Sequence, residues 1–123
     1  MSNRPITVLL VDDDPDVQSV FEIMMRHYKM SFNIVGDAET AIDFLRSHKP
    51  DVVLMDIFLP GMDGYQALDR IRRTSIASNS RIIATTAYYT NDTQQEVINR
   101  GFDGYLPKPF DDGLVGYLRQ ITA

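Results

Sequence analysis

The hydrophobic residues follow two alternating patterns along the chain. Short runs of mostly β-branched apolar residues are typical of strands, and the longer segments between them, with apolar residues every three or four positions, are typical of helices. The expected strands cover residues 7–11, 32–35, 52–55, 82–85 and 104–106. Some of them are apolar at consecutive positions, as is usual for strands covered on both faces. The alternation predicts an α/β fold of five β/α units, with a parallel sheet and helices on both of its faces.

Apolar stripes predict three of the helices, and a largely polar segment predicts a weakly held fourth helix. The stripes are Val17, Val20, Phe21, Met24 and Met25, then Ala38, Ala41, Ile42 and Leu45, and finally Leu114, Val115, Leu118 and Ile121. Asp14 can cap the first helix, which would begin at Pro15. Between residues 91 and 100 only Val97 and Ile98 are plainly apolar. Packing is therefore expected to hold this fourth helix weakly, which would leave it able to move.

The length and composition fit one globular domain that spans residues 1–123. Apolar residues make up 44% and charged residues 24%, both ordinary values for a globular protein. The longest apolar run near the start is far shorter than the ~20 residues of a membrane span, and no secretory leader precedes it. We therefore expect a cytoplasmic protein without membrane association. The net charge of −5 argues against direct nucleic-acid binding, and the absence of cysteine excludes thiol catalysis and thiolate metal sites.

Acidic, hydroxyl and cationic side chains follow the expected strands at the point where each strand ends. Asp12, Asp13 and Asp14 come after the first strand, and Asp56 ends the third. Thr86 follows the fourth strand, and Lys108 follows the fifth. In an open parallel sheet the carboxyl ends of the strands form the ligand-binding edge. These side chains are therefore expected to meet at one site, with Asp14 serving only as the helix cap.

Repulsion among the acids predicts a cation at this site. Two carboxylates about 5 Å apart repel each other by roughly 3 kcal/mol at an effective dielectric constant near 20, so Asp12, Asp13 and Asp56 together need compensation. A retained proton or a divalent cation would supply it. Oxygen donors without histidine or cysteine favour a hard ion, and a site with few protein ligands favours Mg²⁺ over Ca²⁺. Lys108 adds a positive charge and Thr86 a hydroxyl donor, which together with Asp56 as nucleophile suit an aspartyl phosphate.

Four segments resemble motifs of the receiver domains of two-component response regulators, of the chemotaxis type. They are the acidic pair in residues 9–14, the phosphoacceptor loop in residues 55–64, Thr85-Thr86-Ala87, and Gly104-Tyr105-Leu106-Pro107-Lys108-Pro109-Phe110. The resemblance runs nearly end to end. It implies a doubly wound, flavodoxin-like sheet of five parallel strands in the order 2-1-3-4-5, and a cis bond between Lys108 and Pro109.

The resemblance also implies roles for individual residues. Asp56 would accept the phosphoryl group, Lys108 would bind it, and Thr86 and Tyr105 would be the switch residues. Mg²⁺ would be held by Asp13 directly and by Asp12 mostly through water. Asp56 and the backbone carbonyl of Phe58 would complete the protein ligands.

The function implied is a phosphorylation switch. A sensor histidine kinase or a histidine phosphotransfer protein would supply the phosphoryl group to Asp56. The surface of the fourth helix, fifth strand and fifth helix would then change its preference for a downstream protein. The chain would not be an enzyme in the usual sense, although it would assist its own Mg²⁺-dependent phosphorylation and dephosphorylation.

Other functions fit the sequence less well or stay open. A phosphatase of the haloacid-dehalogenase type needs an acid two residues after the nucleophile, where this chain has Phe58, and no glycine-rich nucleotide loop occurs. The chain ends soon after the fifth helix, so it is expected to be either a stand-alone receiver or a fragment of a hybrid kinase or larger regulator. An unphosphorylated receiver-like binding module is a further alternative. Phe58 and Tyr88 are hypothesised to restrict attacking water and prolong the phosphorylated state, and Tyr88 with Tyr89 could instead contact a partner.

Overall fold

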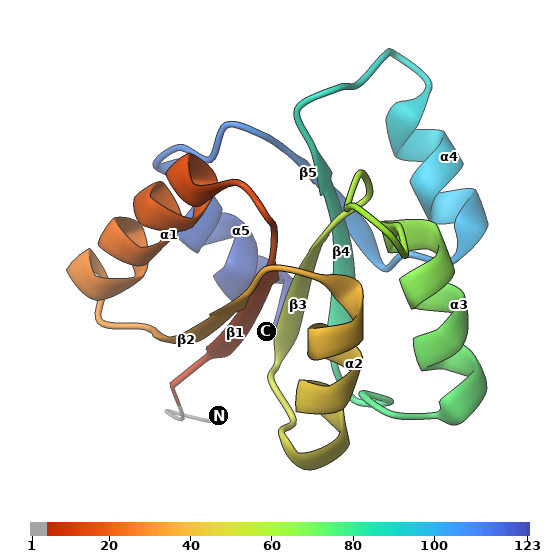
Figure 1. The fold of residues 1–123 in the computed structure, drawn as a ribbon. Helices are drawn as coiled ribbons and strands as arrows, with labels where there is room; N and C mark the ends of the chain where they lie inside the picture. Colours follow the sequence, from red (N-terminus) through yellow and green to blue (C-terminus); the bar gives the residue numbers. More distant parts are fainter. Residues whose placement is uncertain (1–4) are drawn as a thin grey trace.

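A computed structural model describes residues 5–123, in which strands and helices alternate from end to end (Figure 1). The strands are β1 (Thr7–Val11), β2 (Ser31–Val35), β3 (Val52–Asp56), β4 (Arg81–Thr86) and β5 (Gly104–Pro107). The helices are α1 (Pro15–His27), α2 (Ala38–Ser47), α3 (Gly64–Thr74), α4 (Thr93–Arg100) and α5 (Gly113–Ile121). Each expected strand differs from the observed one by no more than one residue at either end, which confirms the five β/α units.

The five strands form one parallel sheet in the order β2-β1-β3-β4-β5, as expected (Figure 1). Helices α1 and α5 cover one face of the sheet, where the core includes Phe21, Met25 and Leu114. Helices α2, α3 and α4 cover the other face, where the core includes Leu45, Ile71 and Val97. No helix in residues 5–123 is long and apolar enough to cross a membrane.

Helix ends follow local sequence signals. Asp14 caps α1 by accepting a hydrogen bond from the N–H of Asp16, and Pro15 occupies the first turn, as expected. The apolar pattern alone did not place α3. Its start is fixed by a capping box in which Asp63 and Gln66 bond each other's backbone N–H groups.

The fourth helix differs in detail from the sequence interpretation. Thr93 counted there as one of the polar residues that weaken packing, but its side chain is buried and its hydroxyl accepts a hydrogen bond from the Thr90 N–H. Ile98 is instead 41% exposed, which leaves Val97 as the buried apolar residue of this helix. The side chain of Asp92 at the start of α4 makes no cap hydrogen bond. Apolar packing of α4 is therefore slight, as expected, although the residues responsible are partly different.

Candidate functional site

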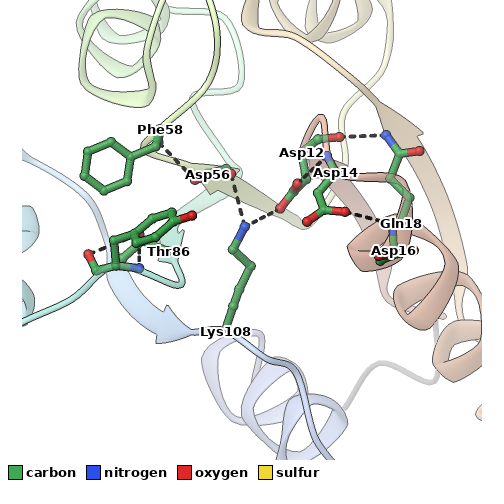
Figure 2. A network of polar contacts seen from close by, with 9 residues as sticks. Asp12, Asp14, Asp16, Gln18, Asp56, Phe58, Thr86 and Lys108 are labelled. Carbon is green, nitrogen blue, oxygen red and sulfur yellow. Dashed lines mark hydrogen bonds and ion pairs between the residues drawn. The ribbon is translucent and has the colours of Figure 1, made fainter.

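Polar side chains at the carboxyl ends of β1, β3 and β5 meet at one edge of the sheet, as expected, whereas the Thr86 hydroxyl at the end of β4 bonds the Tyr88 backbone (Figure 2). Asp12 follows β1, Asp56 ends β3 and Lys108 follows β5, and the three side chains are buried together. The Lys108 Nζ lies 2.7 Å from Asp12 Oδ2 and 3.1 Å from Asp56 Oδ2. The topology thus joins residues that are up to 96 positions apart in the sequence.

Backbone amides bind the second oxygen of each buried carboxylate. The Asp14 N–H donates to Asp12 Oδ1 and the Phe58 N–H donates to Asp56 Oδ1, each at 2.9 Å. The Gln18 side chain also donates to the Asp12 carbonyl at 2.7 Å, which ties the first turn of α1 to this loop. Both carboxylates are therefore fixed in orientation by one ammonium contact and one backbone contact (Figure 2).

Burial and charge act in opposite directions on the ionisable groups of the site. Burial raises the pKa of Asp12, and its hydrogen bonds to Lys108 and to the Asp14 backbone only partly offset that rise. For Lys108, burial alone would lower the pKa of the ammonium. The hydrogen bond to Asp12 and the charge of Asp56 outweigh burial, so the pKa of Lys108 is raised and the ammonium stays charged.

Asp12, Asp13 and Asp56 fit the donor set of a hard cation. Each offers a carboxylate oxygen, and these oxygens lie within 4.8 Å of one another. Asp13 is exposed, whereas Asp12 and Asp56 are buried, so the group opens to solvent on one side. One lysine contacts two of the three acids, which leaves negative charge in excess. An oxygen-lined acidic pocket of this kind suits Mg²⁺. That the backbone carbonyl of Phe58 is also a Mg²⁺ ligand stays a prediction.

The Thr86 hydroxyl is not directed at Asp56 in this structure. Thr86 is fully buried at the end of β4, and its hydroxyl accepts from the Tyr88 N–H at 3.0 Å and donates to the Tyr88 carbonyl at 3.3 Å. Tyr105 packs against the core cluster on the α2, α3 and α4 face, and its ring lies edge-on to Tyr89. Its buried hydroxyl has no hydrogen-bond partner in residues 5–123. Burial and the nearby Tyr89 raise the pKa of Tyr105.

Two aromatic side chains meet beside the acids. The rings of Phe58 and Tyr88 lie 5.9 Å apart in an edge-on arrangement, although the two residues are 57% and 78% exposed. The sequence places each of them near the mouth of the site but gives no sign that they touch. Their contact joins the loop after β3 to the loop after β4.

Gly64, which ends the segment that resembles the phosphoacceptor loop, has a packing role that the sequence did not reveal. A Cβ atom at this position would lie 2.6 Å from the Asp56 carbonyl oxygen and 2.6 Å from the Ile57 Cα. Such close approach to backbone atoms is possible only for glycine. The first turn of α3 therefore packs directly on the end of the strand that carries Asp56.

Lys108 and Pro109 are joined by a cis peptide bond, as the resemblance implies. On α3, the exposed guanidinium of Arg72 bonds the Gly101 carbonyl and the Asp103 carboxylate, each at 3.1 Å.

Comparison with known proteins identifies relatives of the whole chain. Response regulator Rre1 of Synechocystis is 33% identical over 122 residues, which cover 98% of this chain and 53% of that protein. The nitrate/nitrite response regulator protein NarL of Escherichia coli K12 is 32% identical over 100% of this chain and 58% of NarL. The chain thus spans little more than half the length of these two regulators.

A solved structure supports the same relationship. The receiver domain of sensor histidine kinase PA1611 from Pseudomonas aeruginosa is 32% identical, with a TM-score of 0.85 over 97% of this chain and 98% of that one. That structure holds a magnesium ion in its active site cleft. The family model for the response regulator receiver domain matches residues 8–116. The chain therefore belongs to the family of response regulator receiver domains.

Proposed function

We propose that Asp56 accepts a phosphoryl group and that residues 1–123 act as one receiver domain of a two-component or phosphorelay system. The observation that carries this proposal is the way Asp56 is held. One carboxylate oxygen bonds the Phe58 N–H, the other bonds the Lys108 ammonium, and Asp12 lies on the far side of that ammonium. The nucleophile is thus fixed in orientation, next to a cation able to take up phosphoryl charge.

The proposed phosphoryl donor is a phosphohistidine. An Asp56 oxygen forms a bond to phosphorus while the P–N bond to the donor imidazole breaks. The electron pair of that bond returns to the imidazole nitrogen. This nitrogen takes up a proton from water, and the donor leaves as neutral histidine. Lys108 moves one N–H from Asp56 Oδ2 to a phosphoryl oxygen and stabilises its charge. Because Phe58 stands where an acid would be needed to hydrolyse other substrates, the domain works as a switch.

We propose Mg²⁺ as the cofactor, held by Asp12, Asp13, Asp56 and the Phe58 carbonyl. The support is the cluster of carboxylate oxygens, its excess negative charge and its exposure at Asp13. When bound, Mg²⁺ would neutralise the carboxylates and the phosphoryl oxygens. Dephosphorylation by water is proposed to need the same residues.

The proposed switch uses Thr86 and Tyr105. Thr86 exchanges its two bonds with the Tyr88 backbone for a bond to a phosphoryl oxygen, which frees the loop after β4. Tyr105 lies on the same face of the sheet, and no hydrogen bond from within residues 5–123 holds its hydroxyl in place. Movement of both residues alters the surface formed by α4, β5 and α5.

The proposed phosphodonor is a sensor histidine kinase or a histidine phosphotransfer protein, and the output partner is a protein that binds the α4, β5 and α5 surface. The net charge of −5 argues against direct contact with nucleic acid. A receiver that forms part of a hybrid histidine kinase or larger regulator would use the same chemistry. A cytoplasmic location stays a prediction.

Intact-mass spectrometry after incubation with acetyl phosphate and Mg²⁺ tests the proposal. The parent protein should gain one phosphoryl group, and the gain should disappear with a chelator or in Asp56→Asn. Asp69→Asn, which removes an exposed acid on α3, is the matched control and should still be phosphorylated. No gain in the parent protein would favour an unphosphorylated binding module instead.

A further inference from the structure

Thr85 is a buried polar residue beside the acceptor that the proposed function does not use. It pairs with Asp56 in the register of β3 and β4, and its carbonyl accepts from the Ile57 N–H at 3.1 Å. The side chain is fully buried. Its hydroxyl has no hydrogen-bond partner in the part of the chain that the structure describes.

The two consecutive threonines of β4 face opposite sides of the sheet. Leu54 of β3 and Ile83 of β4 both belong to the core cluster under α1 and α5. Because side chains alternate along a strand, Asp56 and Thr85, each two residues further on, face that same layer. Thr86 faces the layer of α3 and α4. Thr85 is therefore on the same side of the sheet as Asp56, in the neighbouring strand.

A hydroxyl at this position needs a partner to be energetically acceptable. Burying an unbonded hydroxyl is unfavourable, and valine has nearly the same shape without the polar atom. A candidate partner is the Lys108 ammonium, because it bonds Asp56, the residue paired with Thr85 in the register of β3 and β4. It carries three N–H donors, of which one bonds Asp12 and one bonds Asp56.

We propose that Thr85 is a positioning residue for Lys108, and that its hydroxyl accepts a hydrogen bond from the third N–H of the ammonium through one water. This inference rests on the proposed phosphorylation of Asp56. Lys108 must turn one N–H from Asp56 to the incoming phosphoryl oxygen while it keeps its bond to Asp12. A third bond to Thr85 fixes the rotation of the ammonium, so that the released N–H points at the phosphoryl group. In this proposal the Thr85 hydroxyl acts on the transfer only through Lys108.

The rate of phosphorylation by acetyl phosphate and Mg²⁺ in three variants tests this role. Thr85→Val should react about tenfold more slowly, since a hydrogen bond to a charged group is worth at least that much. Thr85→Ser should restore the rate. In a Lys108→Met background, Thr85→Val should change the remaining rate by less than about twofold, because the partner is gone.

The NMR signals of the lysine side chains give a second readout that does not depend on turnover. The chain has three lysines, Lys29, Lys49 and Lys108, so assignment is direct. The Lys108 ammonium protons should exchange slowly with water in the parent and in Thr85→Ser, and faster in Thr85→Val. Thr85→Ala takes the place of the valine variant if the latter does not fold.

The outcomes separate this inference from the function on which it rests. A parent protein that gains no phosphoryl group overturns the proposed function. A parent that is phosphorylated, together with a Thr85→Val variant of equal rate and equal lysine exchange, overturns only the role of Thr85. Slowing of equal size in the Lys108→Met background also overturns it, because Thr85 would then act independently of the lysine.

Discussion

The acidic edge of the sheet and the face beyond β4 are held by different means. At the acidic edge, both oxygens of Asp12 and of Asp56 are bonded, and the contacts come from three strand ends. Beyond β4, the Thr86 hydroxyl bonds only the loop two residues further on, and the Tyr105 hydroxyl bonds nothing in residues 5–123. The side chains of the acidic edge are therefore fixed in one arrangement, whereas those beyond β4 can rearrange with the loss of few hydrogen bonds.

This difference suits the proposed division of work between the two regions. A nucleophile and its cation need fixed positions because misplacement lowers the rate of transfer. A signalling surface needs two arrangements of similar free energy, because phosphorylation can shift an equilibrium only by its differential interaction with the two states. The region near α4 fits the need for two arrangements of similar free energy, because few contacts hold it. One example is the start of α4, where the Asp92 side chain makes no cap hydrogen bond.

Lys108→Met should be the most damaging change, since it removes the cation shared by the two buried acids. Uncompensated buried charges of this kind cost about 3–5 kcal/mol in the free energy of unfolding. Urea denaturation would measure the loss, with Lys49→Met as the control, because Lys49 is exposed and bonds only a carbonyl. Added Mg²⁺ should return part of the stability of Lys108→Met. Equal losses in the two variants would show that the acidic edge is not held as described.

Gly64→Ala should be the next most damaging change, because the new Cβ meets backbone atoms of Asp56 and Ile57 at the end of β3. Backbone cannot move aside as a flexible side chain can, so a loss of about 1–3 kcal/mol is expected. Gly116→Ala in α5 is the matched control. A Cβ there meets nothing within 4 Å, so alanine should stabilise that helix by up to about 1 kcal/mol. Thermal unfolding of both variants should shift in opposite directions, and a tolerant Gly64 would mean that the acceptor strand is less fixed than the geometry indicates.

Tyr105→Phe tests the loosely held region and should have a smaller effect of opposite sign. Removing a buried hydroxyl that has no partner among the described residues should leave the stability of the unphosphorylated protein unchanged or raise it by up to about 1 kcal/mol. Thr86→Val should instead destabilise by about 1 kcal/mol, because it removes both bonds to the Tyr88 backbone. Denaturation curves of the two variants would measure both changes in the free energy of unfolding. A clear loss of stability in Tyr105→Phe would reveal that its hydroxyl is held after all.

The sequence was sufficient for the five strands, four of the helices and the convergence of the acids, but its apolar pattern did not place α3. Each strand is an apolar run bounded by polar or turn residues, and parallel topology brings the strand ends to one edge whatever the exact packing. The sequence was not sufficient to predict features that depend on strand register or on the direction of a side chain. Thr85 and Thr86 are identical residues that face opposite layers, and only the pairing of β3 with β4 shows which one accompanies Asp56. Thr93 is polar yet buried, because it bonds Thr90 at the start of α4.

The contact between Phe58 and Tyr88 likewise could not be predicted from the sequence, because it depends on how two loops lie relative to each other. The two rings meet edge-on, one from each of the two regions compared above. Both rings remain largely exposed, so the pair adds little to stability. We hypothesise instead that the pair lies on the approach of water to a phosphorylated Asp56.

Tyr88→Ala should therefore have the smallest effect, which appears in kinetics. Without the ring, water reaches the phosphoryl group more easily, and dephosphorylation should accelerate about threefold, equivalent to roughly 0.7 kcal/mol in barrier height. Loss of phosphate from the purified phosphorylated protein, followed by intact mass, gives the rate. Tyr89→Ala is the control, because Tyr89 contacts Tyr105 and not Phe58. An unchanged or slower rate in Tyr88→Ala would remove the barrier role and leave Tyr88 as a candidate partner contact.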